Sequence, residues 1–269
     1  MKIIVLAKQV PNTNNVKINP ETGTMIREGV ESILNPDDAN ALEAALQIKD
    51  TLGEENVHVT MVTMGPDQAK EMMIEGMAMG ADDAIILSDR KFGGSDTWAT
   101  SNAIAAGIRK IGDYDIILGG RQAIDGDTAQ VGPQIAEKLG LPQITYAEEI
   151  TFDGYEKGDS VRVKRQLEDG YEIVEAKLPC MITCVKELNT PRYMNVGRII
   201  DAYDQPERIT IWHFDDVDIT EDKTGLKASP TNVFKSFGPK PKGKGVILEG
   251  TDKEKVDALL GDLKKKHII

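Results

Sequence analysis

Short apolar runs alternate with longer segments of helical periodicity over the first two thirds of the chain. Runs typical of buried strands occupy residues 3–6, 57–63, 84–87 and 114–118. Between these runs, apolar residues recur at helical spacing over residues 36–52, 66–79 and 95–111. Because apolar strands that alternate with helices form parallel sheets covered on both faces, the pattern predicts a doubly wound α/β fold.

Turn and cap residues mark where these helices begin and end. Asn35 precedes Pro36, as an N-cap residue precedes a proline at the first helical position. Gly53, Gly80 and Gly112 each follow a helical segment, as C-terminal stop residues do. We therefore expect Asn35 to cap the first helix and the three glycines to end the helices that they follow.

The pattern changes after residue 142. Three short alternating runs, at residues 145–152, 160–166 and 171–176, are separated by glycine and aspartate, which is typical of antiparallel strands. A further apolar strand is expected at residues 179–184. The predicted fold is therefore α/β and Rossmann-like: a doubly wound, mostly parallel sheet with an added antiparallel part.

The last quarter of the chain has a different character. Residues 201–241 contain four prolines and no obvious core, which predicts an extended C-terminal arm. Residues 253–266 have the periodicity of a terminal helix with apolar residues on one face. We therefore divide the chain into an α/β domain of residues 1–200 and an arm and helix of residues 201–269.

Composition excludes several classes of partner. The 44 acidic residues outnumber the 32 basic ones and set the net charge at −12, which disfavours binding to nucleic acid or to an anionic membrane. No apolar run approaches the length of a transmembrane helix or a signal peptide, so we expect a cytoplasmic protein without membrane insertion. Cys180 and Cys184, about 13 Å apart in an extended segment, are too distant for a disulfide and are expected to be reduced.

Catalytic and metal-binding patterns are scarce. The three histidines are isolated from each other and from the cysteines, so no metal site is expected. Residues 238–245 imitate a phosphate-binding P-loop but lack the serine or threonine that would hold Mg²⁺, and a solvated basic segment is the simpler interpretation. We expect no residue of the chain to act as a catalytic acid, base or nucleophile.

The most informative stretch is residues 118–133, which leaves the carboxyl end of a strand and enters a helix. Gly119 and Gly120 permit close backbone approach, and the Asp125-Gly126-Asp127 turn leads to a helix N-terminus, a favourable place for phosphate. The alternative is a plain strand-to-helix turn. Three other strand ends, at residues 7–11, 35–38 and 63–66, would converge on the same edge, and together the four describe a mononucleotide cleft.

Several motifs together resemble the β subunit of electron transfer flavoprotein. VKRQLEDGYEIV at residues 163–174, followed by PCMIT at 179–183, resembles that family's signature. KQVP at 8–11, residues 120–132 and NTPRY at 189–193 match as well, so the resemblance covers essentially the whole chain. A nucleotide-binding hydrolase of similar fold is the competing hypothesis, but no phosphate-cleaving constellation supports it.

The resemblance implies a cofactor and a partner. Members pair with an α subunit that carries a flavin, and the β cleft holds either AMP or a second FAD. Residues 201–269 would then contact the α subunit. Within residues 1–200, the resemblance implies contacts to the adenosine and its phosphates from Ala7, Asn35, Asp38, Met64, Gln122, Asp125, Gly126, Asp127, Thr128, Ala129, Gln130, Val131 and Gly132.

A second loop favours FAD over AMP. Residues 92–101 follow the strand that ends at Leu87 and open a helix, so they are expected at the same sheet edge. Ser95, Thr97 and Thr100 offer hydroxyls suited to a ribityl chain and a flavin ring, and two adjacent glycines leave room for a flat group. The alternative is an ordinary helix start in which Ser95 or Asp96 caps the first turn.

Residues 96–100 and 225–231 resemble the bacterial electron-bifurcating branch of the family more than the mitochondrial type. This resemblance implies NADH as the electron donor and two acceptors, an acyl-CoA dehydrogenase and a low-potential carrier such as ferredoxin or flavodoxin. The alternative is a non-bifurcating carrier whose β cleft holds structural AMP.

Residues 187–199 resemble the loop by which the family docks on acyl-CoA dehydrogenases. The implied partner-binding residues are Pro191, Arg192, Tyr193 and Val196. Val196 and Gly197 stand where leucine and proline are common, and because valine buries less area, we expect a weaker anchor or a different partner. The alternative is an ordinary surface loop.

Overall fold

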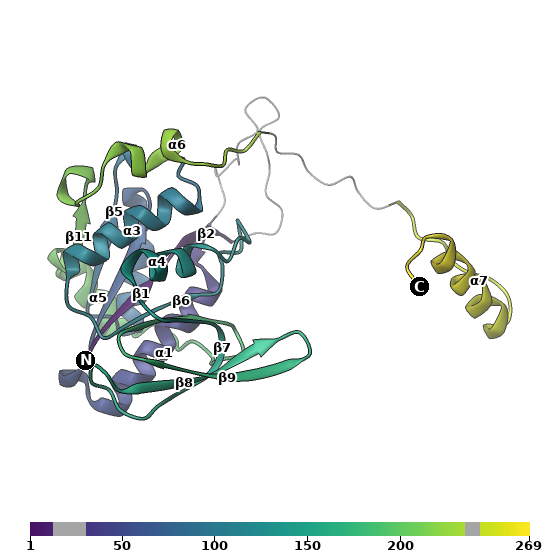
Figure 1. Ribbon diagram of the computed structural model, residues 1–269, viewed down its shortest axis with the longest axis horizontal. Coiled ribbons are helices and arrows are strands. Elements are labelled where there is room, and N and C mark those ends of the chain that lie inside the picture. The colour runs from purple at the N-terminus through teal and green to yellow at the C-terminus, as the bar shows by residue number, and fades with distance from the viewer. Residues whose placement is uncertain (13–30, 235–242) are drawn as a thin grey trace. The chain divides into compact units, whose positions relative to one another are not determined.

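The computed structural model describes residues 1–12, 31–234 and 243–269 (Figure 1). Residues 1–12 and 31–234 belong to one compact unit, and residues 243–269 belong to a second. The predicted P-loop imitation at residues 238–245 lies largely outside the described residues. In the described part of the chain, no helix combines the length and the apolar character needed to cross a bilayer.

One sheet dominates the first unit. Among the described residues its nine strands follow the order β11-β5-β4-β1-β6-β10-β7-β8-β9. Neighbours from β11 to β7 are parallel, whereas β8 and β9 are added antiparallel to β7 and to each other. The strands are β1 (Lys2–Leu6), β4 (His58–Met64), β5 (Asp83–Leu87), β6 (Ile116–Gly120), β7 (Gln143–Phe152), β8 (Ser160–Leu167), β9 (Gly170–Lys177), β10 (Cys180–Cys184) and β11 (Ile209–Trp212). The predicted fold class is confirmed.

Helices cover both faces of this sheet (Figure 1). Apolar residues of α1 (Pro36–Leu52), α2 (Lys70–Met79) and α5 (Val196–Asp204) share one core with one face of the strands. Apolar residues of α3 (Thr97–Ile111) and α4 (Val131–Leu139) share a second core with the opposite face. The strands between these two layers are buried on both faces, which is why they appear in the sequence as continuous apolar runs.

Local signals predict the helix boundaries well. Helix α1 spans the predicted residues, and Gly53, Gly80 and Gly112 end α1, α2 and α3. The predicted helix at 66–79 is divided, since a 3₁₀ turn over Asp67–Ala69 precedes α2. Cys180 and Cys184 are free thiols buried in β10, as predicted.

The predicted extended arm is partly wrong. Residues 201–204 continue α5, and residues 209–212 form β11, which pairs with β5 at the edge of the main sheet. Phe214 is buried and Trp212 packs beside it against the α3 side of the sheet. The compact unit therefore extends to Phe234, and the predicted domain boundary at residue 200 does not coincide with it.

The second unit contains α7 (Asp252–Lys265), close to the predicted terminal helix. A capping box between Thr251 and Glu254 begins this helix, with each side chain bonded to the other's backbone N–H. Val256, Leu259 and Leu260 are exposed, so no core among the described residues of its own unit covers the apolar face of α7.

Side chains at the N-terminus of α1 form hydrogen bonds to the segments that follow two strands, β1 and β6. Asn35 occupies the N-cap position but makes no capping bond, contrary to the prediction. Its amide donates to the Gln122 carbonyl (2.9 Å) and accepts from the Ile124 N–H (3.1 Å). The buried Asp38 carboxylate accepts the N–H groups of Lys8, after β1, and Gly120, at the end of β6, each at 2.8 Å. Helix α1 thus positions the loop that follows β6.

We predict that Gly120→Ala weakens the contact between the start of α1 and the end of β6. A Cβ at residue 120 would lie 2.5 Å from Asp38 Oδ1 and 2.7 Å from backbone atoms of Asp37 and Asp38, which cannot withdraw as a flexible side chain would. The free energy of unfolding should fall by about 1–3 kcal/mol, measured by urea denaturation of the protein in its native assembly. Gly126→Ala is the control, because its Cβ would meet no atom within 4 Å. Equal stability of both variants would contradict the prediction.

We also predict a pH dependence that originates at Asp38. Burial raises the pKa of this carboxyl to about 7, although two N–H donors favour its charged form. Above the unfolded pKa of 3.8, the unfolded chain releases this proton while the folded chain keeps it, so stability falls as pH rises and levels off near pH 7. The unfolding free energy of wild type minus that of Asp38→Asn should fall by about 1.4 kcal/mol per pH unit between pH 5 and 7.

The matched control for this experiment is Asp113→Asn. Lys157 and Lys2 hold the pKa of Asp113 below its usual value, so its protonation lies below the tested range and its difference curve should be flat. A flat curve for Asp38→Asn as well would show that its carboxylate stays ionised throughout.

Candidate functional site

Three predicted site segments meet where the strand order reverses. Strands β4 and β5 lie on one side of β1, and β6 lies on the other. Ligands of open α/β sheets bind outside the carboxyl ends of strands at such a switch point. Ala7 follows β1, Met64 ends β4, and the loop of residues 121–130 follows β6. The structure therefore brings these residues to one edge, as the sequence predicts.

The loop of residues 121–130 has a strained backbone. Asp127 and Ala129 adopt positive φ angles of 50° and 52°, in the left-handed region that side chains disfavour. The Asp127 N–H donates to the Ala123 carbonyl, and the Gln122 amide donates to the Asp127 carboxylate (2.8 Å), which hold the turn in place. Non-glycine residues in this region cost of order 1–3 kcal/mol and cluster at ligand sites.

The same loop leads into the N-terminus of α4. Gln130 is the N-cap residue, and the N–H groups of Val131 and Gly132 fall in the first turn, where no intrahelical acceptor exists. Thr128 and Ala129 immediately precede this turn. Left-handed and helical residues in succession form a concavity of N–H groups that suits an anion, and the positive end of the helix dipole adds to it. The arrangement fits a phosphate.

Gly132 has a second role that the sequence does not reveal. A Cβ there would lie 2.9 Å from both Met181 and Thr183 of β10, so the missing side chain lets α4 pack against the sheet. Substitution of Gly132 would disturb the fold as well as the loop, whereas Gly126 faces open space. The two glycines, similar in the sequence, therefore serve different purposes.

Asp125, another predicted cofactor residue, is paired within the protein. Its carboxylate accepts from the Lys8 ammonium at 2.6 Å. This ion pair connects the segment after β1 to the loop after β6. Asp125 therefore holds the two segments together.

The second predicted loop is connected to the first. The Thr97 hydroxyl donates to the Gln130 side-chain oxygen at 2.8 Å, so the start of α3 and the start of α4 lie side by side. Thr100 lies half-buried in the first turn of α3. Asp96 caps that helix through the Ala99 N–H, which agrees with the alternative interpretation of this segment as a capped helix start.

Ser95 and the adjacent glycines contact the chain's own arm. The Ser95 hydroxyl donates to the Phe92 carbonyl (2.7 Å) and accepts the Gly225 N–H (2.9 Å). A Cβ at Gly94 would lie 3.0 Å from Leu226 of the short helix α6 (Gly225–Ala228). Leu226 therefore occupies the side of Gly94 toward which a Cβ would point, whereas Gly93 and Gly94 both line the cavity described below, so the expected room for a flat ligand stays a prediction.

Asp96 binds the arm directly. Its carboxylate accepts the N–H (3.0 Å) and the hydroxyl (2.7 Å) of Thr231, and its own N–H donates to Ser229. Burial acts to raise the pKa of Asp96, but the hydrogen bonds from Ala99 and Thr231 outweigh it and hold that pKa below its usual value. Residues 225–231 thus pack against the loop of residues 93–96.

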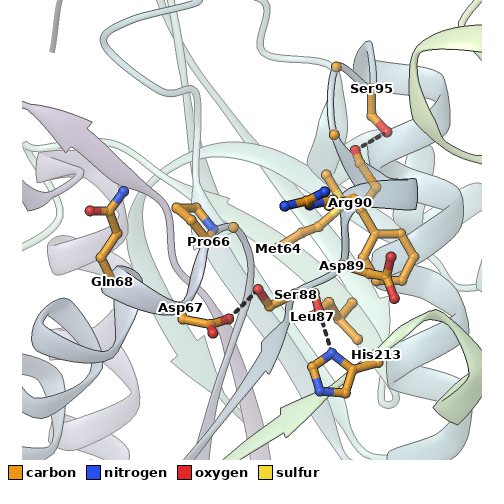
Figure 2. Close-up of a pocket in the computed structure, with 14 residues that line it drawn as sticks. Met64, Pro66, Asp67, Gln68, Leu87, Ser88, Asp89, Arg90, Ser95 and His213 are labelled. Atoms are coloured by element: carbon orange, nitrogen blue, oxygen red, sulfur yellow. Dashed lines mark hydrogen bonds between the residues drawn. The ribbon is translucent and has the colours of Figure 1, made fainter.

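A cavity of about 980 Å³ opens beside these loops (Figure 2). Residues 64–68 after β4 line one side, and residues 87–90 and 92–95 after β5 line another. His213, directly after β11, completes the lining. Two predicted cofactor residues, Met64 and Ser95, belong to this cavity.

The cavity wall contains polar residues that sequence reasoning missed. The Ser88 hydroxyl donates to the Asp67 carboxylate at 2.5 Å, and His213 Nδ1 lies 2.7 Å from the Ser88 carbonyl (Figure 2). Ser88 and Arg90 follow the end of β5, so the strand-end rule could have found them. The signal for His213 is the β-rich run at residues 209–212, which lies within the predicted arm.

The predicted partner loop is held by a polar network on α1. Asn40 and Asn189 exchange hydrogen bonds, each amide donating to the other's backbone carbonyl. The Arg192 guanidinium donates to both oxygens of the buried Glu43 carboxylate, at 2.8 and 3.0 Å, and to Asp50 at 2.6 Å. These two acids raise the pKa of Arg192 further above its already high value. Arg192 thus braces the loop from within, and its partner-binding role stays a prediction.

Apolar side chains protrude beside this brace. Tyr193 is 98% exposed and Val196 is 72% exposed, while Pro191 is half-buried. Val196 begins α5, so the predicted loop ends there, and Val196, Ile200 and Tyr203 form an exposed stripe at helical spacing. Among the described residues, no group of three or more His, Cys, Asp or Glu side chains is placed to hold a metal ion.

Comparison with known proteins agrees with this architecture. Residues 22–209 match the family described as Electron transfer flavoprotein domain. The chain is 59% identical over 270 residues to the Caffeyl-CoA reductase-Etf complex subunit CarD of Acetobacterium woodii, with all of both chains covered. It is 52% identical over 269 residues to the Electron transfer flavoprotein subunit beta of Clostridium acetobutylicum, again with full coverage of both.

A third relative is named for a different complex. The chain is 51% identical over 275 residues to the Acryloyl-CoA reductase electron transfer subunit gamma of Anaerotignum propionicum, with all of both chains covered. These similarities confirm the resemblance seen in the sequence motifs. The chain therefore belongs to the electron transfer flavoprotein family, in which it aligns from end to end with β subunits.

Proposed function

We propose that the protein is the β subunit of a heterodimeric electron transfer flavoprotein and works in the cytoplasm with an α subunit. Val233 and Phe234, at the end of the first unit, are almost fully exposed, and α7 exposes its apolar face within the second unit. Exposed apolar groups of this extent are typical of a surface that a partner covers. The α subunit is the partner that the family supplies, so the arm and α7 are its proposed contacts.

The proposed cofactor of the β cleft is FAD. The observation that carries this proposal is that Met64 and Ser95, from two separate predicted segments, line one cavity of about 980 Å³. AMP would need only the loop of residues 121–130, which follows β6 where the strand order reverses. A dinucleotide would need this phosphate site together with further space beyond it. The N–H groups of residues 128–132 would hold the phosphates. The hydrogen bond from Thr97 to Gln130 would hold the loops of residues 92–101 and 121–130 in fixed positions around the cofactor.

The protein's part in the chemistry is to bind and orient the cofactor. A flavin supplies the electron-accepting ring when bound, and the chain supplies position, polarity and exclusion of water. The packing of residues 225–231 over residues 93–96 would shield one side of the site. No residue of the cleft is required as a proton donor or acceptor.

The proposed reaction takes electrons from NADH and divides them between two acceptors. One is an acyl-CoA dehydrogenase, and the other is a low-potential carrier such as ferredoxin or flavodoxin. Two relatives are named for reductases of CoA esters, which supports a CoA-ester enzyme as one acceptor. The second candidate function is a non-bifurcating carrier with AMP in the β cleft, which the phosphate-binding geometry would serve equally well.

Cofactor stoichiometry distinguishes the two functions. The αβ complex should release two FAD per heterodimer, and NADH should bleach the flavin absorbance, because both the donor site and the second flavin belong to the bifurcating form. Denaturation, chromatography and anaerobic titration measure these quantities. One FAD and one AMP per heterodimer, with no response to NADH, would contradict the proposal and favour the simple carrier.

The proposed docking surface consists of Tyr193, Val196, Ile200 and Tyr203. Tyr193→Ala should raise KM for the acyl-CoA dehydrogenase at least tenfold with little change in kcat, since a protruding aromatic ring is a common binding hot spot. Steady-state electron transfer from the loaded αβ complex measures both constants. Tyr193→Phe is the control, because it keeps the ring and should keep wild-type KM. Equal KM for wild type and Tyr193→Ala would place the docking surface elsewhere.

A further inference from the structure

The exposed apolar stripe on α5 is bordered by carboxylates. Helices α2 and α5 pack together and carry Glu71, Glu75, Asp201 and Asp204. Glu75 is half-buried, and the other three are exposed. In the part of the chain that the structure describes, no basic side chain lies within ion-pair distance of any of the four. Their negative charge is therefore not neutralised by these neighbours.

The arginines of this surface are already paired within the protein. Arg192 is held by two acidic residues of α1, and Arg198, in the first turn of α5, donates to Glu54 at 2.6 Å. Apart from Arg198, the basic residue of the two helices is Lys70, which begins α2 and is half-buried. The surface around the stripe thus keeps an excess of negative charge.

The carboxylates lie on both flanks of the stripe. On one flank, the Tyr203 hydroxyl donates to the Glu71 carboxylate of α2 at 2.7 Å. Successive residues are separated by about 100° around a helix, so Asp204 lies next to Ile200 on the flank away from Tyr203, and Asp201 lies beyond it. A partner that covers the apolar side chains would therefore meet carboxylates on either side.

These charges do not stabilise the fold where they lie. Asp201 and Asp204 occupy the last turn of α5, where the negative end of the helix dipole disfavours carboxylates and no basic residue is present. Burial raises the pKa of Glu75, and the carboxylates of Glu31 and Glu71 raise it further, so the ionised form is disfavoured there as well. Groups that lower stability are common where a surface serves a function.

We infer that this surface recognises a protein whose apolar pocket is bordered by lysine and arginine side chains, and that Asp201 and Asp204 steer this partner into place. The inference rests on the proposed function, in which an acyl-CoA dehydrogenase docks here, and adds the charge that this enzyme must present. The apolar stripe would determine how long the complex lasts. The carboxylates would act on the rate of association, because charges at the rim of an interface mainly change that rate and its salt dependence.

The test measures how the flavin-loaded αβ complex binds immobilised acyl-CoA dehydrogenase, by surface plasmon resonance. In about 50 mM NaCl, the double variant Asp201→Asn/Asp204→Asn should associate about fivefold more slowly than wild type, with dissociation within about twofold. The difference should disappear in about 0.5 M NaCl, where exposed charges are screened. The urea midpoint of unfolding should not fall, since the variant removes charges that the helix dipole disfavours.

The matched control is Glu168→Gln/Asp169→Asn. These two exposed acidic residues lie in the turn between β8 and β9, so the control removes the same charge from another part of the fold. It should leave both rates unchanged. Equal slowing by the two double variants would overturn the inference, because the net charge of the protein would then steer the partner.

The remaining outcomes separate this inference from the proposed function. If wild type does not bind the dehydrogenase, the proposed docking is wrong, and this inference falls with it. If wild type binds and Tyr193→Ala weakens binding, but Asp201→Asn/Asp204→Asn associates like wild type at low salt, only the role of the carboxylates is overturned. Loss of the α subunit or of stability in that variant would overturn it too, since the carboxylates would then serve assembly or folding.

Discussion

The Asp38 carboxylate holds together the three elements around the candidate cleft. It lies in the first turn of α1 and accepts the N–H of Lys8, which follows β1, and the N–H of Gly120, which ends β6. Burial of a carboxyl group is costly unless it is hydrogen bonded, so these two contacts offset part of that cost here. The absence of a side chain at Gly120 permits the approach. The strained loop after β6 therefore starts from a defined position, and the proposed phosphate contacts of that loop depend on it.

Helix α1 also reaches the proposed docking surface. Its first residues contact the cleft through Asn35 and Asp38, while Asn40 and Glu43, one to two turns later, hold the segment that carries Tyr193. A single packed helix thus supports both the proposed cofactor site and the proposed protein contact. Sites built on rigid elements keep their geometry better than sites on loops alone, which suits the proposed role of the protein in positioning electron carriers.

Local chemistry is sufficient to predict most of the fold. The bounds of α1, the glycine stops and the buried strands follow from periodicity, capping and turn preferences, which act over a few residues. Parallel strands present their carboxyl ends at one edge of a sheet, and this rule alone brings Ala7, Met64 and the loop of residues 121–130 together. The same rule, applied to the end of β5, would include Ser88 and Arg90.

The sequence by itself determined the element types, the sheet edge at which the candidate site segments meet, and the family. Only the tertiary structure decided how the polar side chains are used. Asn35 resembles a helix cap but bonds to the loop after β6, and Arg192 resembles a surface contact but is held by Glu43. The run at residues 209–212 became a strand because β5 had an edge to pair with. In each case the deciding partner is distant in the sequence, so no local pattern could reveal which hydrogen bond or strand pairing would form.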